Sequence, residues 1–159
     1  MNRATVEQIH AAFGDERYWR ARLDVYGGDS IALDSLTVDA DGTVEIVTTQ
    51  DLRRDVLPAV IAKALPPGFA LLRNEIWRPA DDRRVRGEVT INASGVGGSA
   101  LGSAVIAPMP VGSSMRFTGN VEVRVPLIGG QIEKYIAAEI VKEIPGVGIF
   151  TDDWISAHG

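Results

Sequence analysis

Three side chains that could act on a ligand stand at alternate positions of one predicted strand, which covers residues 69–77. They are Arg73, Glu75 and Trp77. If they face an apolar interior, Arg73 and Glu75 are charged groups in a hydrophobic pocket, and buried charges are usually paired or functional. A carboxylate in such a pocket can act as a general acid or base, with Tyr135 as a candidate donor beside it.

The opposite phase of that strand is equally compatible with the sequence. It carries Leu72, Asn74 and Ile76, and successive side chains of a strand point to opposite faces. Neither phase is purely apolar, so the sequence leaves open which one faces the interior. This strand is the one place where we expect ligand orientation or catalysis.

The other residues suited to metal or nucleophile chemistry lack the spacing that such sites need. Nothing in the sequence brings His10 and His158 together with carboxylates. Asp39, Asp41 and Gly42 are similar to the start of a calcium loop, but the glycine stands at the fourth position instead of the sixth. We interpret them as a hairpin turn. These patterns assign no metal site, no cofactor and no catalytic residue, and no Gly-x-Ser-x-Gly elbow indicates a hydrolase.

Two further motifs have ordinary structural interpretations. The glycine-rich stretch at residues 95–98 is followed by a predicted strand and has no lysine nearby. A phosphate loop needs a helix after it, so we predict a flexible turn. The charged cluster at residues 51–55 is either a gate or partner surface, or a helix cap with solvated ion pairs that contribute little to stability.

Composition predicts one globular domain over residues 1–159. The chain is 45% hydrophobic, has no cysteine and carries a net charge of −5, which argues against disulfides and against a nucleic-acid partner. The N-terminus has no apolar stretch typical of a secretory signal. Residues 89–115 carry no charge, but glycines and prolines interrupt them, so we expect no stable membrane insertion and a cytoplasmic protein.

Periodicity gives the order of the elements. Two short helices come first, and Thr5 with Gln8 is a candidate capping box. A hairpin turns at Asp41-Gly42 and has a bulge near Asp34. The elements predicted after this hairpin are a helix over 51–65, strands over 69–77, 84–91, 101–107 and 115–125, and a helix over 131–144. The last helix ends at a break or kink caused by Pro145.

Consecutive strands joined by hairpin turns predict an antiparallel sheet. The run from Met115 to Val125 alternates apolar and polar residues most regularly, so one face of the sheet is buried. The C-terminal helix is available to cover that face. We therefore expect an α+β fold, in which a curved antiparallel sheet wraps around a long C-terminal helix and leaves an apolar cavity between them.

Beside this order of elements, eight stretches of the sequence match a known family. They are residues 6–13, 18–23, 49–55, 57–58, 77–79, 84–89, 125–130 and 132–134, which extend over nearly the whole chain. On these residues the chain resembles the START-like (SRPBCC) helix-grip superfamily, which has the birch-pollen-allergen fold, and within it an actinobacterial family of unknown function. The resemblance implies an α+β helix-grip fold and binding of lipids, sterols, polyketides or other apolar molecules, and in some branches cyclase or dehydratase activity.

One departure from the superfamily concerns the first strand. Members usually carry a β-strand before the first helix, whereas only Met1 to Ala4 precede it here. We expect this strand to be missing, through biology or through a start codon placed too late. An open sheet edge then invites pairing with a second copy.

Three functions fit these observations. The first is binding of a hydrophobic small molecule, such as a lipid, sterol or polyketide, between the sheet and the last helix. The second is a cyclase or dehydratase that uses Glu75, which we favour less because no histidine reaches the pocket. The third is an interaction protein whose own side chains fill the core, paired as a homodimer through the open edge. The expected ligand-binding residues are Leu57, Ile61, Leu71, Glu75, Trp77, Val89, Phe117, Val121, Ile132, Tyr135, Ile136 and Ile140.

Overall fold

The computed structural model covers residues 1–159 and describes all of them except 27–29, 52–58, 60–62, 64–69, 94–96 and 125–126. Six strands form one antiparallel sheet in which each strand pairs with the next along the chain. The strands are β1 (Ile31–Val38), β2 (Val44–Asp51), β3 (Ala70–Ala80), β4 (Arg84–Ala93), β5 (Gly97–Pro108) and β6 (Ser113–Arg124). The described helices are α1 (Val6–Phe13), α2 (Glu16–Tyr26) and α4 (Gly129–His158).

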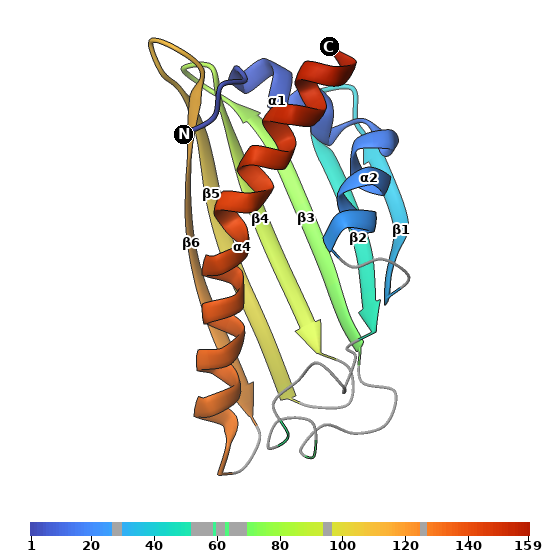
Figure 1. Ribbon diagram of the computed structural model, residues 1–159, viewed down its shortest axis with the longest axis vertical. Helices are drawn as coiled ribbons and strands as arrows, with labels where there is room; N and C mark the ends of the chain where they lie inside the picture. The colour runs from blue at the N-terminus through green and yellow to red at the C-terminus, as the bar shows by residue number, and fades with distance from the viewer. Residues whose placement is uncertain (27–29, 52–58, 60–62, 64–69, 94–96, 125–126) are drawn as a thin grey trace.

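The helices lie on one face of the curved sheet (Figure 1). α4 begins beside the end of β6 and crosses the sheet obliquely, while α1 and α2 cover the part of this face that α4 leaves open. The α+β helix-grip architecture expected from the sequence is confirmed. The helix expected over residues 51–65 falls almost entirely outside the described residues.

Local capping explains where the first helices begin. The Thr5 hydroxyl accepts a hydrogen bond from the Gln8 amide, and the Gln8 side chain accepts one from the Thr5 amide, which confirms the predicted capping box. The Asp15 carboxylate accepts from the Arg17 amide at 2.9 Å, in the first turn of α2. Both helices therefore begin where their unpaired amide groups find side-chain acceptors.

The Asp15–Arg17 pair predicts a component of acid sensitivity. Hydrogen bonds from Arg17 hold the pKa of Asp15 below its ordinary value. Because the folded-state pKa is lowered, this contribution to stability is present above about pH 4, the usual unfolded value, and is lost as the pH falls through the folded value. We expect Asp15→Asn to lose less stability than the wild type between neutral and acid pH, measured by urea unfolding across a pH series. Asp24→Asn, an exposed change on the same helix, should behave as the wild type does, and parallel curves for all three proteins would contradict the prediction.

The turns follow the predicted chemistry at the first hairpin and depart from it in β5. Gly42 has a φ of 87°, a left-handed conformation that suits glycine, and the Asp41 carboxylate accepts from the Thr43 amide. The predicted bulge appears as a register shift between Leu33 and Ser35. In contrast, β5 begins at Gly97, so the turn predicted over residues 95–98 was wrong for its second half. There Gly97 and Gly98 pair with the end of β6.

α4 is longer than predicted and passes through Pro145 without ending. Of the predicted break or kink, the break was therefore wrong. A proline removes one hydrogen bond, here the bond to the Val141 carbonyl. Val141 is 69% exposed, so water can satisfy this carbonyl. Beyond the proline, α4 buries Thr151, Asp152 and Ile155, and this packing holds the second half of the helix in place.

The main core lies where α1, α2 and the second half of α4 meet the sheet. Aromatic rings dominate it: Phe13 lies 4.8 Å from Trp77, 5.6 Å from Tyr18 and 5.8 Å from Trp19, measured between ring centroids. The Tyr18 hydroxyl is 2.8 Å from that of Thr151 on α4. A second, smaller cluster surrounds Ile132 near the start of α4.

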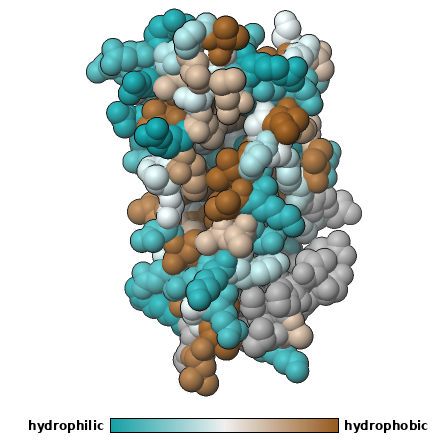
Figure 2. Space-filling view, turned by 60° about the vertical axis from the view of Figure 1, so that its left-hand side comes forward, coloured by the Kyte–Doolittle hydropathy of each residue, from teal (hydrophilic) through white to brown (hydrophobic). Residues whose placement is uncertain are grey.

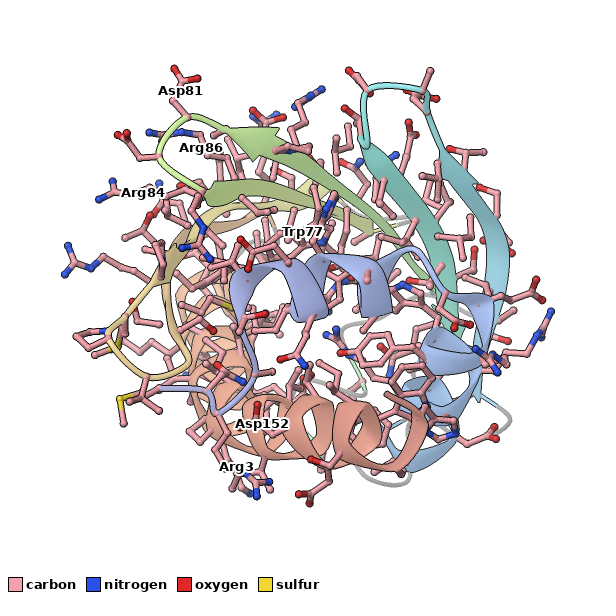
Figure 3. All side chains as sticks on the ribbon, turned by 90° about the horizontal axis from the view of Figure 1, so that it is seen from above. Arg3, Trp77, Asp81, Arg84, Arg86 and Asp152 are labelled. Carbon is pink, nitrogen blue, oxygen red and sulfur yellow. The ribbon has the colours of Figure 1, made fainter. Side chains whose placement is uncertain are left out.

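Residues 2–4 and Asp152 form a clasp between the N-terminal segment and α4. The Asp152 carboxylate accepts from the amides of Arg3 at 2.9 Å and Ala4 at 3.0 Å. Asn2 exchanges two backbone hydrogen bonds with Ser113 at the start of β6. Figure 3 shows Arg3 and Asp152 close together at the α4 side of the molecule. Within the described residues, the bridge between Asn2 and Ser113 is the only strand-like pairing before α1.

Candidate functional site

The structure decides which phase of β3 faces the helices. Glu75 is 3% exposed and Trp77 4% exposed, whereas Leu72 on the opposite phase is exposed. In the sheet, Glu75 stands between Ile46 of β2 and Val89 of β4. The phase that carries Arg73, Glu75 and Trp77 is thus the inner one, as the chemical interpretation of the sequence required.

Glu75 is paired with Arg73 on its own strand. Oε2 of Glu75 lies 3.1 Å from Nε of Arg73. The Arg73 Nε hydrogen does not point at the carboxylate, so this buried nitrogen has an ion-pair partner but no hydrogen-bond partner in the described structure. The pair therefore has an unused donor on the inner face of the sheet, and a buried donor of this kind favours any group that can accept from it.

A second cation, Arg22 of α2, acts on the same carboxylate. Burial by itself lowers the pKa of Arg22, but the attraction of Tyr18 and Glu75 outweighs it and raises the pKa above its ordinary value. The guanidinium lies over the ring of Trp19, 4.7 Å from the centroid. Arg22 therefore stays cationic, and Glu75 lies within the electrostatic reach of two arginines.

A cavity of about 170 Å³ lies between strands β4 to β6 and the first half of α4. Four of the predicted ligand-binding residues line it: Val89, Phe117, Val121 and Ile140. Other lining residues were missed, among them Ile91, Ala100, Gly102, Gly119, Ala137 and Ile144. The cavity borders the charged pair, because Val89 and Ile91 are the β4 neighbours of Glu75 and Arg73.

Two small residues on the inner face of β5, Ala100 and Gly102, line this cavity. Gly98, Ala100, Gly102 and Ala104 alternate along the strand and share one face. A Cβ at Gly102 would lie 2.4 Å from the Phe117 ring, so this ring occupies the space that a side chain at Gly102 would need. This alternation was present in the sequence as a signal for the cavity, but the predictions followed larger apolar residues instead.

The other predicted residues lie outside the cavity lining. Trp77 packs in the main core against Phe13. The cluster around Ile132 takes in the remaining predicted residues of β3 and α4, and Leu57 and Ile61 are outside the described residues. The predicted residues of this cluster are Leu71, Ile132, Tyr135 and Ile136.

The cavity thus separates two packed regions, the aromatic core and the Ile132 cluster. Figure 2 shows hydrophobic residues along the middle of the face where β6 and α4 come forward, with hydrophilic residues beside them. In the part of the chain that the structure describes, no three His, Cys, Asp or Glu side chains could hold a metal ion together. Among the same residues, no helix is long and apolar enough to cross a membrane.

Comparisons with known proteins give relatives without an assigned activity. The profile of a family described as "Protein of unknown function (DUF2505)" matches residues 2–155. Uncharacterized proteins of Mycobacterium tuberculosis and Mycobacterium bovis are each 30% identical to this chain over 158 residues. These alignments cover 96% of this chain and 91% of each relative.

Proposed function

The chain belongs to the family of proteins of unknown function whose profile matches residues 2–155, and from this premise we propose that it binds a hydrophobic small molecule between the sheet and α4. The observation that carries the proposal is the cavity of about 170 Å³ with a mainly apolar lining, beside the ion pair of the buried Glu75 with the partly exposed Arg73. Most ligand sites have this composition, an apolar wall with a few polar groups that fix orientation.

The size of the cavity limits the ligand. An apolar protein cavity of about 150 Å³ is large enough for benzene. The present cavity therefore accepts one aromatic ring or a short hydrocarbon segment, and the rest of a larger ligand extends beyond it. The unused Nε–H of Arg73 suits a ligand whose polar end accepts a hydrogen bond.

The resemblance to the START-like superfamily supports the same proposal, because its members hold apolar molecules between a sheet and a C-terminal helix. Lipids, sterols and polyketides are the ligand classes that this resemblance implies. The catalytic alternative has less support. Glu75 is buried and paired with Arg73, while its suggested partner Tyr135 packs in the Ile132 cluster.

Native mass spectrometry of the freshly purified protein tests the proposal directly. We expect a reproducible added mass that is released when the protein is denatured, and extraction then identifies the molecule. A bare protein that also fails to bind apolar probes would contradict the proposal and favour a core filled by its own side chains.

Filling the cavity should abolish binding without unfolding the protein. Ala100 lines the cavity between Ile91 and Val121, so Ala100→Leu places three more carbons in it. We expect the affinity for 1-anilinonaphthalene-8-sulfonate, measured by fluorescence titration, to fall about tenfold or more, a loss of about 1.4 kcal/mol or more. Ser99→Leu adds a similar side chain to the opposite face of β5 and should leave the affinity unchanged. Equal affinities for wild type and Ala100→Leu would place the probe elsewhere.

A further inference from the structure

In the part of the chain that the structure describes, the outer edge of β6 has hydrogen-bond partners at both ends and is open between them. In an antiparallel ladder, every second residue directs its N–H and C=O to the same side. Ser113 uses its outward groups to pair with Asn2, at 2.8 and 3.0 Å. The Val123 amide donates outward to the Glu133 carboxylate of α4 at 2.9 Å. Among the described residues, no backbone partner reaches the outward positions between them, which are Met115, Phe117, Gly119 and Val121.

The side chains of this edge are self-complementary. Arg116, Thr118, Asn120 and Glu122 alternate with the inward residues and lie on the outer face of the sheet. If two copies of β6 pair antiparallel about a twofold axis at Gly119, Arg116 of each copy stands opposite Glu122 of the other. Thr118 stands opposite Asn120 in the same arrangement. Opposite charges in direct cross-strand pairs stabilise a sheet.

We propose that this chain forms a homodimer in which β6 pairs with the β6 of a second copy, centred on Gly119, so that the two sheets become one. In this dimer, Gly119 stands opposite Gly119 of the second copy. On either side of this centre, Phe117 of one chain stands opposite Val121 of the other. All of these are outward positions, so each facing pair exchanges two backbone hydrogen bonds. The interface is isologous, as a twofold dimer requires.

The two neighbouring registers are disfavoured by different features. Moving the centre to Thr118 places Val123 of one copy opposite Ser113 of the other, a position that Asn2 already holds. Asn2 cannot easily leave, because the clasp ties the segment that follows it to Asp152. Moving the centre to Asn120 places Arg116 opposite Arg124, and like charges directly opposite each other destabilise a sheet.

The Gly119 register leaves the occupied ends largely undisturbed. The three facing pairs, from Phe117 to Val121, use neither Ser113, which Asn2 holds, nor Val123, whose amide donates to Glu133. Arg116 has no ion-pair partner among the described residues, whereas Glu122 contacts the exposed Arg124 at 3.1 Å. An exposed pair of this kind contributes little, so Glu122 is free to turn to the arginine of the second copy.

Charge reversal tests the proposal by sedimentation over a concentration series. Arg116→Glu and Glu122→Arg each create two like-charge contacts in the dimer, so each should shift the protein to monomer. The double variant Arg116→Glu/Glu122→Arg restores both contacts and should restore the dimer. Arg86→Glu, on the same outer face but on β4, serves as the control and should dimerise as the wild type does. A wild type that is monomeric at every concentration, or a dimer that neither single change affects, would overturn the proposal.

Cysteine pairing tests the register independently, because the chain has no cysteine of its own. Thr118 and Asn120 face each other only when the centre is Gly119, at a non-hydrogen-bonded position where Cα atoms are about 4.5 Å apart. A mixture of the Thr118→Cys and Asn120→Cys proteins should therefore give a mixed disulfide on mild oxidation. Each variant alone should remain uncrosslinked. Thr118→Cys crosslinked to itself would place the centre at Thr118 and overturn this register, and circular dichroism confirms that each variant is folded.

Discussion

Asp152→Ala is expected to lower the free energy of unfolding by about 2–4 kcal/mol. The carboxylate is 7% exposed and accepts from the backbone amides of Arg3 and Ala4. Alanine leaves both donors without this acceptor, and a buried donor without a partner costs about 1–3 kcal/mol. For a domain of this length the midpoint of thermal unfolding should fall by roughly 4–16 °C, measured by circular dichroism.

The adjacent residue provides the matched control for this prediction. Asp153 binds the Arg3 guanidinium at 2.7 Å, but both side chains are largely exposed. An exposed ion pair contributes about 0–1 kcal/mol, so Asp153→Ala should leave the unfolding midpoint almost unchanged. If the two variants lose equal stability, the carboxylate charge near Arg3 matters and the backbone contacts of Asp152 do not.

Gly87→Ala is expected to be the second most damaging change, although it adds one methyl group. A Cβ at Gly87 would lie 2.4–2.7 Å from three atoms of the Trp77 ring. The ring cannot move away freely, because it packs against Phe13 at a centroid distance of 4.8 Å. Overpacking of a dense core costs about 1–3 kcal/mol, and we expect a loss in this range by urea unfolding.

Gly130 provides the control for this prediction, because replacing it adds the same methyl group without an overlap with another side chain. Among the described residues, no atom apart from the adjacent helix backbone lies within 4 Å of a Cβ built at Gly130, near the start of α4. Alanine is also the better helix former, by up to about 1 kcal/mol. Gly130→Ala should therefore leave stability unchanged or raise it slightly. A Gly87→Ala protein as stable as the wild type would mean that Trp77 has a second position in the core.

Most of the fold could be predicted from the sequence because its signals are local. The Thr5–Gln8 capping box, the Asp41-Gly42 turn and the regular alternation of β6 each specify their structure within a few residues. The two errors, at Gly97-Gly98 and Pro145, have a common cause. Glycine disfavours a strand and proline disfavours a helix, but contacts with distant parts of the chain outweigh these preferences. Gly97 and Gly98 pair with β6, and the half of α4 that follows Pro145 is held by its buried residues.

The candidate site was only partly predictable, because a cavity depends on what is missing as much as on what is present. The sequence predicted that Val89, Phe117, Val121 and Ile140 would face the interior, and they line the cavity. It could not show that Trp77 is used by the aromatic core, since that depends on the position of Phe13 in α1. Nor does β3 alone reveal its inner phase, which the helices determine by covering Glu75.

The clasp also affects the order of events when the protein is synthesised. Asn2 and Asp152 are 150 positions apart in the chain, and their side chains meet in the folded protein. During synthesis residues 2–4 leave the ribosome long before their acceptor, Asp152, is made. Residues 2–4 therefore cannot bind this acceptor until synthesis has passed Asp152 in α4. The clasp cannot close before that point, and a nascent chain stalled before Asp152 would keep residues 2–4 accessible to proteases.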